Sequence, residues 1–307
     1  DEIARVAQVA GVAMSEEEKL YKPKAEATNA DRVGANYIRE AATVEQNKFR
    51  IEVRAFRVED NEDGGDPDCR GPLRKNCTRL NTIGQRVIGV EDIRGATFDL
   101  IGSYGVAKNA EVGLKIQGII ESFKRDDGSS TTFEDVGDIV VYGKFVQEVA
   151  ANCVLGGGLE LSTPPWNGLA EKARTVRTGA GFDAEGSRTG TSTGELGLNP
   201  FISSRYQVGR IAVGAHIGYH FYTDDDVEEV LNYSAHTILR GSDFYALRLE
   251  LNGRLWDQFG EKWHDIALLP GVDLPLADNV TFRPTGLVNL TNTALDWGIG
   301  AGVAATF

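Results

Sequence analysis

The stretch Ala110–Glu121, AEVGLKIQGIIE, decides the fold class. Every second residue from Ala110 to Ile120 is apolar or glycine, and the positions between them include Glu111, Lys115, Gln117 and Glu121. A period of two residues indicates a β-strand whose two faces meet different surroundings. The stretch is long for a strand of a water-soluble domain, but it suits a tilted strand that crosses about 30 Å of hydrocarbon. It therefore predicts a membrane-crossing strand.

The same alternation recurs along the chain and predicts about twelve strands: 48–58, 96–107, 110–121, 137–149, 152–162, 194–206, 210–222, 232–240, 243–256, 264–274, 279–290 and 294–307. An even number of strands places both ends of a barrel on the same side of the membrane. We therefore expect an all-β, antiparallel, up-and-down transmembrane β-barrel over residues 48–307. Both termini are expected to be periplasmic.

The connections between these strands alternate in length. Short turns are predicted at 108–109, 150–151, 207–209, 241–242 and 275–278, and longer connections at 59–95, 122–136, 163–193, 223–231 and 257–263. Short turns on one rim and long loops on the other are typical of outer-membrane barrels. The alternative is a water-soluble antiparallel barrel or sandwich, whose apolar faces would point inward. The apolar faces carry no charged residue over most of their length, which favours the membrane barrel.

Composition and charge narrow the function classes. The 307 residues carry a net charge of −13, with 32 basic and 45 acidic side chains. Nucleic acid is therefore not expected as a partner, because phosphate binding needs a basic face. No run of eighteen apolar residues occurs, which argues against a transmembrane helix. The chain starts at Asp1 without a basic or apolar leader, so we expect that an export signal has been removed.

Two of the three cysteines, Cys69 and Cys77, lie in the polar stretch 60–80. This placement favours a disulfide that closes a loop in an oxidising compartment. The alternative is a pair of free thiols.

Residues 1–47 do not share the period of two. Apolar residues at Ile3, Val6, Ala10 and Ala13 have helical spacing, so a short, partly helical segment is expected. This segment is either a soluble periplasmic tail or a plug that enters the lumen. Small residues on the inward face of the last strand would leave room for a plug: Gly298, Gly300, Gly302 and Ala304.

Several strand and turn phrases resemble a known bacterial family. They are VGDIVVYGKF at 136–145, GGLELSTP at 157–164, GTSTGE at 190–195 with LNP at 198–200, LELNGR at 249–254, and DWGIG at 296–300 with the strand that ends at Phe307. They are similar to phrases of the meta-pathway phenol-degradation transporter-like family, and the resemblance covers roughly 136–307. It implies an outer-membrane channel for small hydrophobic or aromatic compounds. The first three strands, the cysteine loop and the N-terminal segment have no counterpart in it.

The polar faces of the strands line the lumen if the apolar faces meet lipid, because a charge in hydrocarbon costs about 2–4 kcal/mol at the midplane. The residues expected to line the lumen and contact a solute are Arg50, Arg54, Glu111, Lys115, Lys144, Glu160, Arg205, Arg210, His216, Arg248, Glu250, Arg254 and Arg283. The arginines either gather on one wall, where they would attract anions, or alternate with glutamates in a salt-bridged and largely closed core.

No catalytic residue, metal ligand or cofactor is expected. His216 and His220 share a face, but four residues of a strand span roughly 13 Å, too far for one ion. The expected partners are outer-membrane lipid and lipopolysaccharide, a small solute, and either further copies of the chain or other envelope proteins. The competing functional class is a non-conducting barrel that serves as an anchor, an adhesin or a subunit of an envelope complex.

Overall fold

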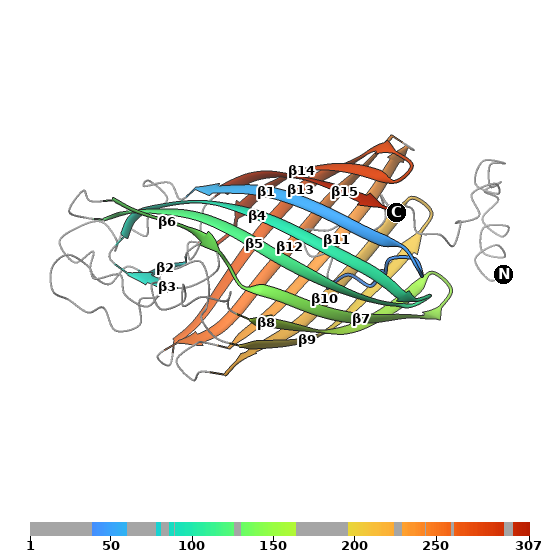
Figure 1. The fold of residues 1–307 in the computed structure, drawn as a ribbon, viewed down its shortest axis with the longest axis horizontal. Coiled ribbons are helices and arrows are strands. Elements are labelled where there is room, and N and C mark those ends of the chain that lie inside the picture. Colours follow the sequence, from blue (N-terminus) through green and yellow to red (C-terminus); the bar gives the residue numbers. More distant parts are fainter. Residues whose placement is uncertain are drawn as a thin grey trace, which may run out of the picture.

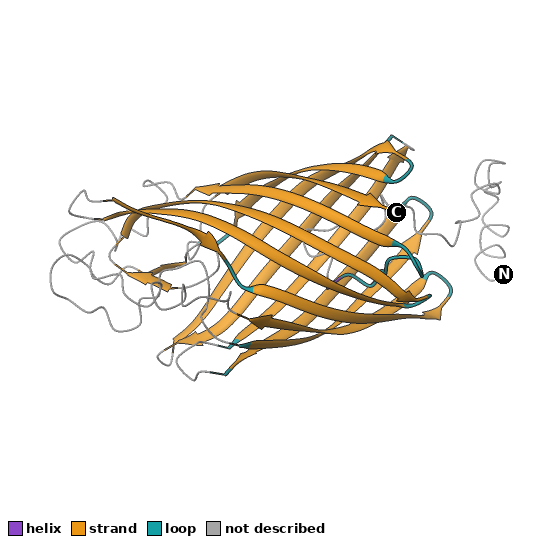
Figure 2. Cartoon of the chain, viewed as in Figure 1, coloured by secondary structure: helices purple, strands orange, loops and turns teal. Residues whose placement is uncertain are grey.

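The computed structural model describes residues 39–59, 78–80, 86–88, 90–125, 130–163, 196–223, 229–242, 244–258, 261–291 and 297–307. The strands are β1 (Phe49–Glu59), β2 (Thr78–Leu80), β3 (Arg86–Ile88), β4 (Val90–Ala107), β5 (Ala110–Arg125), β6 (Ser130–Val136), β7 (Ile139–Ala150), β8 (Cys153–Thr163), β9 (Gly197–Val208), β10 (Ile211–Tyr222), β11 (Val230–Ser242), β12 (Tyr245–Gln258), β13 (Glu261–Ala277), β14 (Val280–Asn289) and β15 (Trp297–Thr306) (Figures 1 and 2). Within these ranges, no helix has the length and apolarity needed to span a membrane.

The main sheet closes on itself. Its strand order is β4-β1-β15-β14-β13-β12-β11-β10-β9-β8-β7-β5-β6, and β4 also pairs with β5. β5 pairs with β7 over Ala110–Lys115 and with β6 over Gly118–Lys124, so β6 and β7 together fill one strand position. The result is the predicted closed, antiparallel barrel of twelve strands. The short strands β2 and β3 pair only with each other.

The two ends of the barrel sequence meet at the rim that carries the short turns. β1 and β15 pair from Arg50 with Thr306 to Glu59 with Trp297. The Phe49 N–H donates to the Phe307 carbonyl (3.1 Å), and the Phe307 N–H donates to the Phe49 carbonyl (2.8 Å). First and last strands therefore complete the barrel without a free edge.

Two predicted connections are wrong: 122–136 contains the end of β5, at Arg125, and all of β6, and 257–263 is reduced to the two residues between Gln258 and Glu261. Most other strand boundaries agree with the sequence prediction within a few residues, but β4 begins at Val90 rather than at residue 96. Residues 91, 92 and 94 are Glu, Asp and Arg, so the apolar alternation fades before the strand ends. β4, β5 and β6 extend beyond the barrel wall at the end opposite the short turns (Figure 1). At the short-turn rim, Asn152 (φ 63°) and Gly209 (φ 54°) take left-handed backbone conformations that allow tight reversals.

Burial alternates along the strands in the sense predicted for a membrane barrel. In β9, Phe201 and Arg205 on the inner face are 4% and 8% exposed, whereas Ile202 between them is 65% exposed on the outer face. The same holds around the wall: apolar side chains lie outside and most charged side chains inside. The water-soluble alternative requires the reverse and is wrong for this chain.

Aromatic side chains surround the short-turn rim on the outer surface. Those that are exposed there are Phe49, Tyr104, Phe145, Tyr206, Tyr245 and Phe307. Such a belt is expected where a barrel meets the interface of a bilayer. Tyr222, at the other end of the barrel, lies outside this belt: it faces the lumen and stacks on His220 with ring centroids 4.3 Å apart.

Residues 39–46, the lumen segment, precede β1 and lie inside the barrel. Glu40, Ala41, Ala42 and Val44 are all buried. The segment passes Gly105, where a Cβ atom would lie only 2.1 Å from the Glu45 carbonyl oxygen, so a side chain at this position would block its path. The lumen segment contains no α-helix.

Two predictions fall outside the described residues. The helical spacing of Ile3–Ala13 lies in residues 1–38, and Cys69 and Cys77 lie in residues 60–77. The third cysteine, Cys153 at the start of β8, is a free thiol. The disulfide and the roles considered for residues 1–47 therefore stay predictions.

Candidate functional site: the charged lumen

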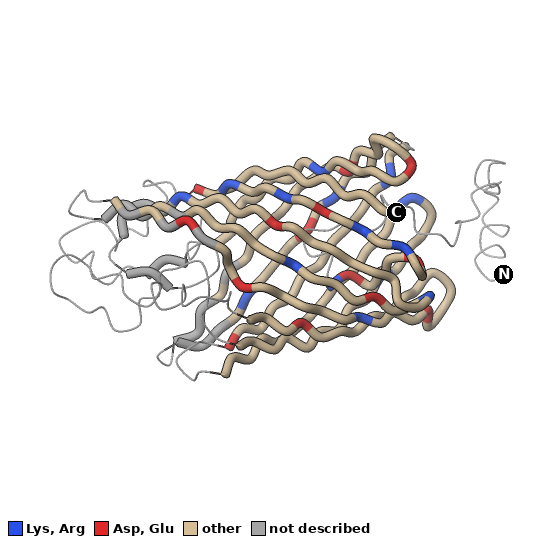
Figure 3. Tube along the Cα trace, viewed as in Figure 1, with Lys and Arg blue, Asp and Glu red and all other residues tan. Residues whose placement is uncertain are grey.

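Charged residues recur along many strands of the barrel (Figure 3). Of the predicted lumen residues, nine are buried on inner strand faces: Arg50, Glu111, Lys144, Glu160, Arg205, His216, Arg248, Glu250 and Arg283. A buried charge needs a partner of opposite sign, because desolvation costs several kcal/mol per ion. The pairing of these groups therefore determines the character of the lumen.

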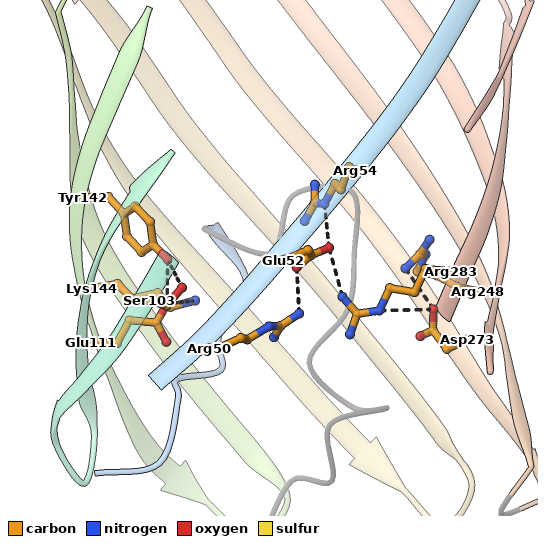
Figure 4. Close-up of polar contacts among 10 residues, drawn as sticks. All are labelled: Arg50, Glu52, Arg54, Ser103, Glu111, Tyr142, Lys144, Arg248, Asp273 and Arg283. Atoms are coloured by element: carbon orange, nitrogen blue, oxygen red, sulfur yellow. Dashed lines mark hydrogen bonds and ion pairs between the residues drawn. The ribbon is translucent and has the colours of Figure 1, made fainter. Parts of the chain in front are cut away.

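Glu52 is the centre of the largest ion-pair cluster (Figure 4). Its Oε2 accepts from Arg50 Nη2 (2.8 Å), and its Oε1 accepts from Arg54 Nε (2.6 Å) and Arg283 Nη1 (3.1 Å). Arg50 and Arg54 flank Glu52 on the inner face of β1, while Arg283 reaches it from β14. One carboxylate thus holds three guanidinium groups in place.

Asp273 on β13 continues this cluster. Its Oδ1 accepts from Arg248 Nη1 (3.2 Å) and lies 4.0 Å from Arg283 Nε. Arg248 Nη2 also donates to Thr285 Oγ1 (2.8 Å). We call Arg50, Glu52, Arg54, Arg248, Asp273 and Arg283 the arginine wall. Its four arginines and two carboxylates alternate across neighbouring strands, so it combines both arrangements that the sequence left open.

A second cluster lies on β4, β5 and β7. Ser103 Oγ is 2.6 Å from the Tyr142 hydroxyl, which donates to Glu111 Oε1 (3.1 Å). Lys144 Nζ lies 3.4 Å from the same oxygen. The other oxygen of Glu111 accepts the backbone N–H of Val44 (2.6 Å), so this cluster also binds the lumen segment to the wall.

Arg39 also links the lumen segment to the wall. Its Nε and Nη2 donate to Oε1 and Oε2 of Glu160 on β8, at 2.6 and 2.8 Å. Asn199 Nδ2 on β9 donates to Oε2 of Glu160 as well (2.8 Å). This bidentate geometry is the strongest form of an arginine–carboxylate contact.

The histidines of the lumen form hydrogen bonds with serines. His216 Nδ1 is 2.5 Å from Ser234 Oγ, and His220 Nε2 is 3.2 Å from Ser162 Oγ. Among the residues that the structure describes, no three His, Cys, Asp or Glu side chains are grouped to hold a metal ion.

The remaining predicted lumen residues differ in position. Lys115 is half-buried and lies 3.5 Å from Asp99 Oδ2, and Arg254 is half-buried on the inner face of β12. Arg210 differs from the prediction. It lies exposed in the turn between β9 and β10, where its Nη1 donates to the Gly241 carbonyl (3.3 Å), because β10 starts one residue later than expected.

Sequence reasoning missed several members of these clusters. Asp273 alternates with Val272 and Leu274 in a predicted strand, so its inward position could have been read from the period of two. The sequence pattern did not single out Tyr142, because its immediate neighbours are apolar or glycine. Arg39 and Asn199 carried no signal, since the segment before β1 has no period and asparagine is common in both strands and turns.

Comparison with known proteins supports the architecture. No family model matches the chain, and no curated protein matches it by sequence. The structure is similar to the COG4313 outer membrane channel from Pseudomonas putida F1, with a TM-score of 0.58 and 10% identity over 86% of this chain and 97% of that chain.

Two porins are more distant in structure. The KdgM porin in complex with disordered oligogalacturonate has a TM-score of 0.47 and 11% identity, over 84% of this chain and 99% of that chain. The NanC porin has a TM-score of 0.47 and 8% identity, over 83% and 98%. The likeness to the COG4313 channel, at 10% identity, shows the barrel fold alone, and the phenol-degradation transporter-like family stays a prediction.

Proposed function

We propose that this chain is a porin-like channel of the outer membrane that passes small solutes along its charged lumen. The observation that carries the proposal is the inverted barrel: charged side chains line the inside while apolar side chains cover the outside. Such a wall is stable in a bilayer and offers polar solutes a path that hydrocarbon does not. The fold shared with an outer-membrane channel supports the same function.

The lumen segment narrows the lumen. The lumen segment occupies part of the cross-section, and Arg39 extends to Glu160 on the wall. A barrel of twelve strands has only a moderately wide interior. We therefore expect a low conductance that rises when the contacts of the lumen segment are removed.

The substitution Arg39→Ala tests this proposal in planar lipid bilayers. The variant loses both bonds to Glu160, so the start of the lumen segment can leave the wall. We expect the single-channel conductance to rise by about twofold or more, because conduction depends on the open cross-section. The matched control is Arg57→Ala, which removes an arginine that pairs with Glu59 on the outer face of β1 and should leave the conductance unchanged.

A non-conducting barrel is the second candidate, and the ion pair and the hydrogen bond that join the lumen segment to the wall favour it. It would serve as an anchor, an adhesin or a subunit of an envelope complex. If the folded natural chain and the Arg39→Ala variant both give no current, the channel proposal is wrong and the non-conducting barrel is supported. The hydrophobic or aromatic solute class implied by the sequence resemblance stays a prediction under the channel proposal.

A further inference from the structure

Arg39 and Glu40 place two opposite charges side by side inside the barrel. They are neighbours in the lumen segment, so their Cα atoms are about 3.8 Å apart. Arg39 binds a carboxylate of the wall, and Glu40 lies within electrostatic range of two cations of the wall. Each charge thus meets a complementary group of the barrel.

The group that meets Arg39 is a preformed carboxylate site. Glu160 is 5% exposed, and Asn199, which donates to Glu160 Oε2 (2.8 Å), is fully buried. The two carboxylate oxygens accept two parallel donors from the guanidinium group at 2.6 and 2.8 Å. A buried, oriented carboxylate of this kind recognises a planar, bidentate cation.

The groups near Glu40 form a cationic site. Lys144 on β7 and Arg205 on β9 are 4% and 8% exposed. They pair with Gly158 and Val154 of β8, on either side of Gly156, where a Cβ atom would lie 3.3 Å from the Cα atom of Ala41, the neighbour of Glu40. Glu40 is itself 5% exposed, and its Oε1 accepts no hydrogen bond from the part of the chain that the structure describes. The lumen segment therefore brings a buried carboxylate to a part of the wall that carries buried cations.

These contacts differ from the rest of the lumen network in what they connect. Arg50 and Glu52 share a strand, and Arg248 and Asp273 lie on neighbouring strands, so those pairs reinforce the sheet itself. Arg39 and Glu160 are 121 residues apart, and their pair joins the wall to a segment outside the sheet. Removing Arg39 and Glu40 would leave the strand pairing intact and two oppositely charged sites vacant.

We propose that these two sites bind a small zwitterionic solute that carries a guanidinium or ammonium group and a carboxylate, and that Arg39 and Glu40 occupy them in the resting chain. This inference rests on the proposed channel function and names its solute class. The lumen segment is tethered directly to β1, so it competes with a solute at an effective concentration in the millimolar range. Solute entry and release of the segment are then coupled.

Calorimetric titration of 4-guanidinobutyrate tests the proposal. This probe carries both charges and is added to the full chain in detergent. The double variant Arg39→Ala/Glu40→Ala vacates both sites and should bind the probe about tenfold more tightly than the natural chain, whose sites are occupied. Adding Glu160→Gln to the double variant should weaken binding by about tenfold, because the carboxylate that pairs with the guanidinium group is lost. Guanidinium and acetate ions, with one charge each, should bind the double variant more weakly than the probe.

Equal affinity of the natural chain and the double variant for the probe would overturn the proposal, and so would an unchanged affinity after Glu160→Gln. If the double variant fails to fold, Arg39→Ala alone provides the test by chemical rescue. Guanidinium ion, but not tetramethylammonium, should then raise its thermal midpoint, and equal effects of the two ions would overturn the assignment.

The two proposals fail separately. If the barrel binds the probe but carries no current, the channel proposal is wrong and the proposed binding site is supported. Current without probe binding would refute the binding site and leave the channel.

Discussion

Glu52 shows how much of the lumen depends on a single side chain. It is 1% exposed and accepts hydrogen bonds from Arg50, Arg54 and Arg283. Within the arginine wall, each of the two carboxylates is shared by more than one arginine. A shared carboxylate fixes several long side chains at once, which reduces the conformational entropy lost for each pair. The position of the guanidinium groups in the lumen therefore depends on this acid.

We predict that Glu52→Gln destabilises the barrel by about 3–5 kcal/mol, because buried arginines lose the charge that compensates them. The remaining surplus of positive charge should also shift the reversal potential in a salt gradient toward anion preference. Urea unfolding in lipid vesicles and bilayer recordings measure the two effects. The control is Glu59→Gln on the same strand, where the pair with the exposed Arg57 predicts a loss below about 1 kcal/mol. Similar losses at both positions would contradict a central role of Glu52.

At the scale of the element, each strand shows where the bilayer begins and ends. On β1 and its partner β4, the aromatic pair Phe49 and Tyr104 lies at the short-turn rim, and the charged pair Glu59 and Arg94 lies toward the other end. From Phe49 to Ala55 the outer face of β1 is apolar, and the charged Arg57 lies next to Glu59 beyond it. Val53 and Leu100, which face each other across the two strands, lie midway and are 54% and 48% exposed. The hydrocarbon midplane is therefore expected at their level.

We predict that Leu100→Arg lowers the free energy of unfolding of the barrel in a bilayer by about 2–4 kcal/mol, the cost of an arginine at the midplane. The matched substitution Val106→Arg, on the same face of β4 but near its end at the rim, should cost about 0–1 kcal/mol. Unfolding titrations in lipid vesicles measure both. A larger loss of stability for Val106→Arg than for Leu100→Arg would show that the hydrocarbon midplane does not lie at the level of Leu100.

At the scale of the whole molecule, the described part of the barrel differs from a water-soluble domain in where its apolar residues lie. The inside holds ion pairs and small clusters such as Ala212, Ile238 and Ala246, and most large apolar residues lie on the outer surface. Closure of β1 onto β15 satisfies the backbone groups at the seam, as a membrane requires. The hydrophobic surface must therefore be covered by lipid or detergent.

We predict that the folded chain is monodisperse in detergent and aggregates when the detergent is removed, because a continuous apolar belt of this size associates in water. Size-exclusion chromatography in matched buffers, with and without detergent, measures this. A monodisperse, folded chain without detergent would contradict the outward direction of the apolar faces, and with it the membrane barrel.

The sequence alone determined the number of strands across the barrel, the direction of their faces and the rim that carries the short turns. These features follow from a period of two and from turn residues, which are local properties of the chain and can be recognised without knowing which strands are neighbours. The same reasoning placed Arg50, Glu111, Lys144, Glu160 and Arg283 on inner faces. It failed where the pattern faded, as at the start of β4 and in β6, and at strand ends, as for Arg210.

Only the tertiary structure decided which charges meet. Arg283 and Glu52 are 231 residues apart, and Arg39 and Glu160 are 121 apart. Their depth in the lumen depends on the register of every strand pair and on the tilt of the strands, and a shift by two residues preserves the faces but changes every partner. The local pattern therefore determines a barrel with a charged interior, whereas the summed register around the closed sheet determines the chemistry of that interior.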